Sequence, residues 1–199
     1  MSLQARERMV ADYRNRFQRY GDQPESVGMS SDGQRFRFRK LMEIGDLRNR
    51  RVLDLGCGIG SFYPFLIEGF GQVEYTGIDL VGEMVDFAAK KYPRARFLCH
   101  DLFAADLKET FDYVLISTVF NYAMTGSEDY IRKLITLAFK HCTRGLGFNF
   151  LSTHANFTDI EMAYYDPAQM LDFCIRNLTR KVLMHHHYER ADVVVFAYR

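Results

Sequence analysis

Polar and apolar residues along this chain fall into blocks whose period changes with position. Residues 3–20 are highly charged and carry apolar residues at Leu3, Met9, Val10, Tyr13, Phe17 and Tyr20. That spacing predicts an amphipathic helix. A stretch rich in turn formers, 21–33, follows it, and 34–44 gives a second helical pattern that Gly45 ends. We therefore expect residues 1–50 to form a helical segment that acts as a lid.

From residue 51 onward, short apolar runs alternate with helical patterns. The expected strands are 51–55, 73–78, 95–99, 112–117 and 145–151, and the expected helices are about 61–68, 82–91, 127–141 and 167–177. Pro93 follows the second of these helices, and Pro167 suits the first turn of the last one. Alternating strands and helices indicate a parallel sheet that is covered on both faces.

The tail of the chain gives two further strand patterns. They span 181–188 and 193–198 and are joined by a turn at 189–192. The sequence thus predicts a single α/β domain over 1–199, with the lid at 1–50 and a Rossmann-like core at 51–199. The core is a doubly wound, mostly parallel seven-stranded sheet that ends in an antiparallel hairpin.

The segment 52–60 reads VLDLGCGIG, an apolar run that places glycines at every second position from Gly56. Glycine tolerates positive φ and allows a ligand to approach the backbone closely. A helix must begin just after it, and a helix N-terminus attracts anions. Dinucleotide-binding folds use G-x-G-x-x-G with an acid about 20 residues later. Here Ser61 takes the last glycine position, whereas Asp79 supplies such an acid.

Four segments together resemble the motifs of class I S-adenosylmethionine-dependent methyltransferases. They are 54–58 (DLGCG), 77–80 (GIDL), 97–103 (FLCHDLF) and 111–117 (FDYVLIS), and they occur in the order found in that family. Residues 31–39, 147–153 and 164–167 also resemble a group of bacterial small-molecule methyltransferase-like proteins. The resemblance therefore covers most of the chain and implies S-adenosylmethionine as the cofactor.

The resemblance implies roles for the glycine turn and its neighbours. The cradle for the methionine part of the cofactor consists of Gly56, Cys57, Gly58 and Gly60. Asp54 supports this turn or the ammonium group of the cofactor. Ser117 lies beside the sulfonium. Arg37 binds the carboxylate, because a guanidinium matches it in a bidentate manner; the alternative is a surface arginine.

The other implied contacts involve the nucleoside. Asp79 accepts hydrogen bonds from both ribose hydroxyls, since a carboxylate offers two oxygens; alternatively it only caps the next helix. Leu80 presses on the adenine face. Asp101 accepts from the adenine amino group, next to a ring nitrogen bonded by the Leu102 amide; the alternative for Asp101 is a plain loop acid.

Methyl transfer from a sulfonium mainly requires alignment of a nucleophile with the methyl group and exclusion of water. A base is needed only if the acceptor arrives protonated. The candidates for catalytic residues are His154, Tyr164 and Asn121. His154 is the best titratable candidate, because histidine is the side chain that commonly serves as a base near neutral pH; the alternative is a surface-loop histidine. Asn121 lacks the proline-rich context of DNA amino-methyltransferases.

Composition and residue spacing argue against several other classes of function. The net charge of +1 does not favour a reader of nucleic-acid backbones. The four cysteines show no metal-type spacing, and the histidines at 185–187 make a poor metal site, so we expect no metal. No apolar run reaches the length of a membrane span. A cytoplasmic protein with reduced thiols is expected.

The expected function is methyl transfer from S-adenosylmethionine to an oxygen or nitrogen of an unidentified small molecule, with the loop 154–166 completing the lid. One alternative is a protein that binds the cofactor without turnover. Another is a nicotinamide-dependent oxidoreductase on a related sheet. A nucleic-acid methyltransferase is less favoured, and the sequence leaves the oligomeric state open.

Overall fold

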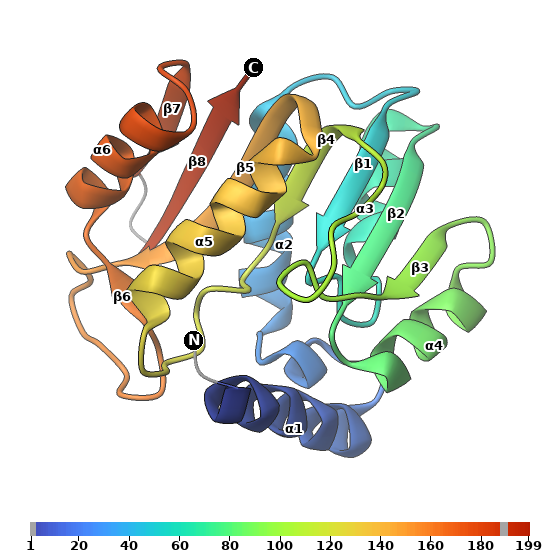
Figure 1. Ribbon diagram of the computed structural model, residues 1–199. Coiled ribbons are helices and arrows are strands. Elements are labelled where there is room, and N and C mark those ends of the chain that lie inside the picture. The colour runs from blue at the N-terminus through green and yellow to red at the C-terminus, as the bar shows by residue number, and fades with distance from the viewer. Residues whose placement is uncertain (1–2, 188–190) are drawn as a thin grey trace.

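The computed structural model describes residues 3–187 and 191–199, in which helices surround one central sheet (Figure 1). The strands are β1 (Arg51–Leu55), β2 (Glu74–Asp79), β3 (Arg96–Cys99), β4 (Phe111–Ile116), β5 (Cys142–Ser152), β7 (Val182–His185) and β8 (Asp192–Tyr198). Their order is β3-β2-β1-β4-β5-β8-β7. β1 to β5 run parallel, and β8 is antiparallel to both β5 and β7. The predicted seven-stranded sheet with a terminal antiparallel hairpin is confirmed.

Helices cover both faces of this sheet. They are α1 (Leu3–Tyr20), α2 (Ser31–Leu41), α3 (Phe62–Phe70), α4 (Gly82–Lys91), α5 (Ser127–Lys140) and α6 (Pro167–Asn177), with 3₁₀ turns η1 (Pro24–Val27) and η2 (Met42–Ile44). Ile131 of α5 and Cys174 of α6 are buried in one apolar cluster. Phe38 of α2, Phe62 of α3 and Ala88 of α4 are buried in the cluster on the other face. The sheet is therefore doubly wound.

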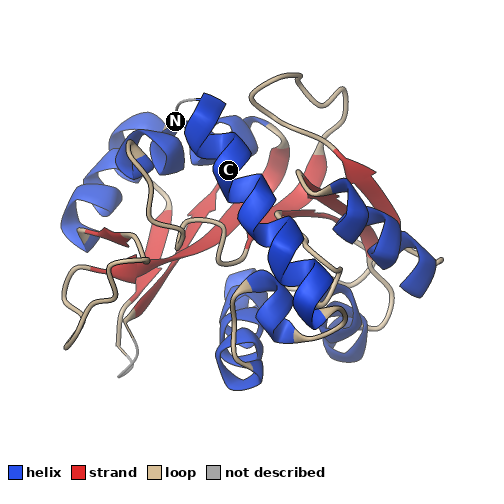
Figure 2. Ribbon diagram, turned by 90° about the horizontal axis from the view of Figure 1, so that it is seen from below, coloured by secondary structure: helices blue, strands red, loops and turns tan. Residues whose placement is uncertain are grey.

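α1 lies across the carboxyl ends of the parallel strands, as the views from the side and from below show (Figures 1 and 2). Two ion pairs hold it there, Arg6 with Asp101 and Arg14 with Glu83, each at 2.6 Å between nitrogen and oxygen. The strand order reverses between β1 and β4, which is where open α/β sheets bind ligands. None of the helices in the described parts of the chain has the length and apolar character needed to cross a membrane.

Several elements differ in detail from the sequence-based expectation. α2 begins at Ser31 rather than residue 34, because the Ser30 side chain accepts a hydrogen bond from the Gly33 amide at 3.2 Å and caps the helix. A two-residue strand, β6 (Tyr164–Tyr165), pairs parallel with the end of β5. Two residues are too few to show a period, so the pattern gave no indication of β6.

The predicted hairpin near the C-terminus is also shorter than expected. β7 ends at His185, and part of the predicted strand 181–188 and of the turn 189–192 lies outside the described residues. Asp192 belongs to β8 rather than to the turn. Within the described residues, no cluster of His, Cys, Asp and Glu side chains has the arrangement of a metal site.

Candidate functional site

The glycine turn after β1 adopts a conformation that side chains disfavour. Gly56 has a φ of 82° and Gly58 a φ of 52°. A Cβ atom on Gly56 would lie 2.2 Å from Cγ2 of Val119, so the position has no room for a side chain. The amides of Gly56 and Cys57 both donate to the carbonyl oxygen of Ile78, at 2.8 and 3.0 Å. These bonds fix the turn against the end of β2.

Asp79 joins this turn to the start of α4. Its Oδ2 accepts from the Gly58 amide at 2.8 Å, and its Oδ1 accepts from the Val81 amide at 2.9 Å. Val81 is the residue that precedes α4, and α4 has no side-chain cap hydrogen bond, so Asp79 contacts the residue before the helix without capping it. Burial raises the pKa of Asp79, and the amide hydrogen bonds oppose that rise. The carboxylate therefore ties three elements together.

Asp54 is buried beneath the turn and is 2% exposed. The hydroxyl of Tyr75 donates to its Oδ2 at 2.6 Å. Burial raises the pKa of Asp54 to about 7, with a smaller contribution from the nearby Asp79 carboxylate, while the Tyr75 hydrogen bond lowers it. Burial also raises the pKa of the Cys57 thiol. Below the glycine turn, Asp54 therefore gains and loses its proton near neutral pH, and the thiol of Cys57 stays uncharged there.

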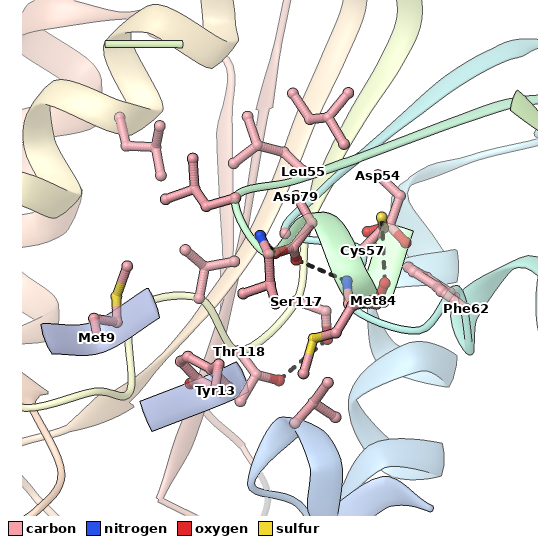
Figure 3. A pocket seen from close by; sticks show the side chains of 18 of the residues that line it. Met9, Tyr13, Asp54, Leu55, Cys57, Phe62, Asp79, Met84, Ser117 and Thr118 are labelled. Atoms are coloured by element: carbon pink, nitrogen blue, oxygen red, sulfur yellow. Dashed lines mark hydrogen bonds between the residues drawn. The ribbon is translucent and has the colours of Figure 1, made fainter. Parts of the chain in front are cut away.

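These groups line a pocket of about 1060 Å³, its open mouth included. Of the cofactor residues predicted from the sequence, nine line it: Asp54, Gly56, Cys57, Gly58, Asp79, Leu80, Asp101, Leu102 and Ser117. Gly60 does not, because a Cβ on it would point at Phe97 and Ala88. In Figure 3, Met9 and Tyr13 of α1 lie across the pocket from Asp54 and Cys57.

Asp101 is held in place from two sides. Its Oδ2 pairs with Arg6 of α1 at 2.6 Å, and its Oδ1 accepts from the Phe103 amide at 2.9 Å. Its side chain is 11% exposed. The neighbouring Leu102 is buried and turns into the apolar cluster beneath α5. Asp101 therefore connects the helix that covers the pocket to the loop after β3.

Arg37 is not among the residues that line this pocket, contrary to the sequence-based prediction. Its guanidinium binds Asp192 through Nε at 2.6 Å and Nη2 at 3.2 Å. Gln34, one turn earlier on α2, lines the pocket instead and is 6% exposed. Its Nε2 is buried and has no hydrogen-bond partner. The sequence did not show which face of α2 meets the pocket, so Gln34 was missed. Gln34 lies four residues before the buried Phe38 and therefore on the same helix face, and this spacing could have identified it.

The end of β4 contains an unusual backbone conformation. Thr118 has a φ of 67°, which is rare for a β-branched residue. Its amide donates to Oδ1 of the fully buried Asn149 at 2.8 Å. Nδ2 of Asn149 in turn donates to Asp192 at 3.2 Å, and Asp192 binds Arg37. A buried polar network thus extends from α2 through β8 and β5 to Thr118.

A second cavity, a groove, adjoins the pocket and shares Tyr13, Val27 and Thr118 with it. α1 forms one of its walls, and the loops 121–125 and 160–162 line it as well. Asn121, a predicted catalytic residue, lines this groove and is 6% exposed, and its Oδ1 is buried without a partner. The hydroxyl of Tyr122 donates to Asp12 across the groove.

The other two predicted catalytic residues line neither cavity. His154 is exposed, its backbone amide donates to Ser152, and its ring lies 6.3 Å from that of His186. The hydroxyl of Tyr164 accepts from the Asp159 amide at 3.0 Å. Neither residue borders the pocket or the groove, and the catalytic roles of His154 and Tyr164 stay predictions.

Proteins with similar sequences carry methyltransferase names. The methyltransferase domain family matches residues 52–145, from β1 into β5. A Mycobacterium tuberculosis protein with a provisional methyltransferase name is 29% identical over 146 residues, 69% of this chain and 86% of that protein. Trans-aconitate 2-methyltransferase of Rhizobium etli is 33% identical over 73 residues, 37% of this chain and 28% of that enzyme.

A solved structure of a DhpI complex with SAM and HEP has the same fold. It superposes with a TM-score of 0.75 over 100% of this chain and 99% of that one, at 14% sequence identity. The family match and the methyltransferase relatives support a class I S-adenosylmethionine-dependent methyltransferase, and the solved structure has the same fold.

Proposed function

We propose that this methyltransferase holds S-adenosylmethionine in the glycine-turn pocket and methylates an oxygen or nitrogen of a small molecule bound in the groove. The observation that carries the proposal is the junction of the two cavities at Thr118. A cofactor that fills the pocket and reaches this residue meets an acceptor that enters from the other side. The relative named trans-aconitate 2-methyltransferase supports a small acceptor.

The residues of the pocket fit this cofactor. Gly56 and Gly58 line the pocket, and a Cβ at either would meet Val119 or Val27, so no side chain of the turn stands between its backbone and the cofactor. The buried, unpartnered Nε2 of Gln34 is a donor suited to the methionine carboxylate. We assign it this role in place of Arg37.

The remaining contacts follow the roles that the family resemblance implies. Asp79, with free lone pairs on both oxygens, binds the ribose hydroxyls. Asp101 and the Leu102 amide bind adenine against Leu80. When bound, S-adenosylmethionine supplies a methyl group on a positively charged sulfur, so that an acceptor lone pair forms the new bond to carbon while the carbon–sulfur electron pair returns to sulfur.

The protein contributes alignment and exclusion of water. Met9 and Tyr13 of α1 close the pocket above the glycine turn, and Thr118 and Asn121 border the path to the acceptor. Holding two reactants in line contributes up to roughly 7–11 kcal/mol to lowering a barrier. Burial raises the pKa of Tyr13 to about 12, so its phenol stays protonated beside the reacting atoms and serves as a donor.

Calorimetric titration with S-adenosylhomocysteine, followed by a screen with methyl-labelled S-adenosylmethionine and small hydroxyl, carboxylate and amine compounds, tests the proposal. Binding with label transfer to a small molecule supports it. Binding without transfer to any compound favours a cofactor-binding protein that lacks turnover. A protein that fails to bind S-adenosylhomocysteine contradicts the assignment of the pocket.

A further inference from the structure

Helix α1 presents three different faces to its surroundings. At about 100° per residue, Met9 and Tyr13 lie on the face toward the pocket. Arg6 and Arg14 lie on a second face. Arg8, Asp12, Arg16 and Arg19, spaced by four, four and three residues, lie on the face that lines the groove. One helix therefore carries arginines in two separate environments.

The arginines on the second face are bound to the protein. Arg6 pairs with Asp101 and Arg14 pairs with Glu83, each at 2.6 Å. These two pairs connect α1 to the loop after β3 and to α4. Their charges are used to hold the helix in place.

The arginines on the groove face have no such partner. Within residues 3–187 and 191–199, no carboxylate lies within ion-pair distance of Arg8, Arg16 or Arg19. Asp12 lies four residues from both Arg8 and Arg16, which is the spacing of helical ion pairs. It instead accepts a hydrogen bond from the Tyr122 hydroxyl. Arg19 lies over the ring of Tyr20, which leaves the guanidinium groups of Arg8 and Arg16 in the groove available to a ligand.

The opposite side of the groove offers a second, independent indication of a ligand. Asn121 is 6% exposed, lines the groove and has a buried amide oxygen without a partner. A buried polar atom that finds no protein partner is uncommon in folded proteins. Arg16 is half-buried, and its guanidinium lies above Gly28, next to Val27 at the junction. Both groups line the same groove.

From this arrangement we propose that the methyl acceptor is an anionic small molecule. Its carboxylate or phosphate binds Arg16 and Arg8, and its polar group next to Thr118 bonds to Asn121. A guanidinium binds either anion in a bidentate manner and with about twice the strength of a neutral hydrogen bond. This inference rests on the proposed function, because it identifies the class of acceptor for the same site.

Binding of anions to protein saturated with S-adenosylhomocysteine tests the inference. The probes are citrate and inorganic phosphate, with glycerol as an uncharged comparison, and calorimetry gives each dissociation constant. We expect citrate or phosphate to bind and glycerol not to bind. The double variant Arg8→Gln, Arg16→Gln should weaken anion binding by about tenfold or more, because both guanidinium groups are removed.

The matched control is Arg14→Gln, which removes an arginine from the same helix but outside the groove. It should leave anion binding within about twofold, and all variants should keep their affinity for S-adenosylhomocysteine. The anion that binds more tightly identifies carboxylate or phosphate as the group recognised. The same variants in the labelled-methyl assay should show a raised KM for the anionic acceptor and little change in kcat.

The possible failures are distinguishable. Loss of S-adenosylhomocysteine binding in the wild-type protein contradicts the proposed function itself. If that cofactor product binds, absence of anion binding, or equal anion binding by the double variant and the wild type, overturns only the anion site. Tighter, arginine-dependent binding of a mixed-sequence oligonucleotide also overturns it, in favour of a nucleic-acid acceptor.

Discussion

The two cavities that meet at Thr118 are lined by different parts of the chain. The pocket combines the glycine turn and the acids at the carboxyl ends of β1 and β2 with apolar side chains, among them residues of α1, η1 and α2. The groove is formed by exposed side chains of α1 and by loops that follow β4 and precede β6. A rigid pocket suits a cofactor common to a family, whereas a groove made of side chains can be changed without altering the sheet.

The largest expected effect concerns the network that supports the junction between the two cavities. Asp192→Ala should lower the free energy of unfolding by about 3–5 kcal/mol, because it leaves the largely buried guanidinium of Arg37 without its partner. Urea denaturation measures this change. The control Asp172→Ala removes an exposed i,i+4 partner of Arg176 and should cost less than about 1 kcal/mol. Equal losses in both variants would show that the network does not support the fold.

The next prediction concerns the pH dependence of stability below the pocket. Asp54 has a pKa of about 7 in the folded protein against an ordinary value of 3.8. Its contribution to stability is therefore complete below 3.8 and is lost as pH rises to about 7, by at most about 1.4 kcal/mol per pH unit. Urea denaturation across this range should show a decline in the wild type that is smaller in Asp54→Asn. Parallel curves for the two proteins would contradict the raised pKa.

Removal of the Asp79 carboxylate tests the cofactor pocket directly. Asp79→Ala should weaken the binding of S-adenosylhomocysteine by roughly 1.5–3 kcal/mol, because charged hydrogen bonds are lost. Calorimetry on the folded variant measures the change. Asp86→Ala, an exposed position on α4, is the control and should bind normally. Unchanged affinity in Asp79→Ala would refute the proposed ribose contact.

Two glycine substitutions distinguish the cost of a positive φ angle from the cost of a steric clash beside the pocket. Gly56 and Gly71 have similar φ angles, 82° and 73°, but a Cβ atom added at Gly56 would meet Val119, whereas one added at Gly71 would meet no atom within 4 Å. Both alanine variants should lose about 1–2 kcal/mol of stability from the positive φ. Only Gly56→Ala should also lose affinity for S-adenosylhomocysteine, as measured by calorimetry. Equal affinity in both variants would mean that the turn does not shape the pocket.

The smallest effect is expected at His154, which lines neither cavity. His154→Ala should leave the affinity for S-adenosylhomocysteine and the turnover of an identified acceptor within about twofold, because its ring lies on the surface. A steady-state assay against the wild type checks this. A large loss of kcat without a loss of cofactor affinity would restore the base role suggested by the sequence.

Helix and strand limits were predicted correctly from the sequence where local residue signals determine them. The limits of α1, β1 and α4 were predicted to the residue, because amphipathic spacing and glycine, proline and charge signals mark them. The glycine turn and Asp79 were also placed correctly in the fold. Both follow parallel strands, and the carboxyl ends of parallel strands form the edge of the sheet at which ligands bind. The two-residue β6 and the cap at Ser30 were missed, since neither carries a period.

The sequence by itself determined the order of elements, the parallel sheet, the methyltransferase motifs and nine of the residues that line the pocket. Only the tertiary structure decided that Gln34 rather than Arg37 lines the pocket, that His154 lines neither cavity, and that Arg8 and Arg16 line a groove without an ion-pair partner among the described residues. The physical reason is that periodicity fixes which residues share a face, whereas the partner of that face depends on contacts between segments far apart in the chain.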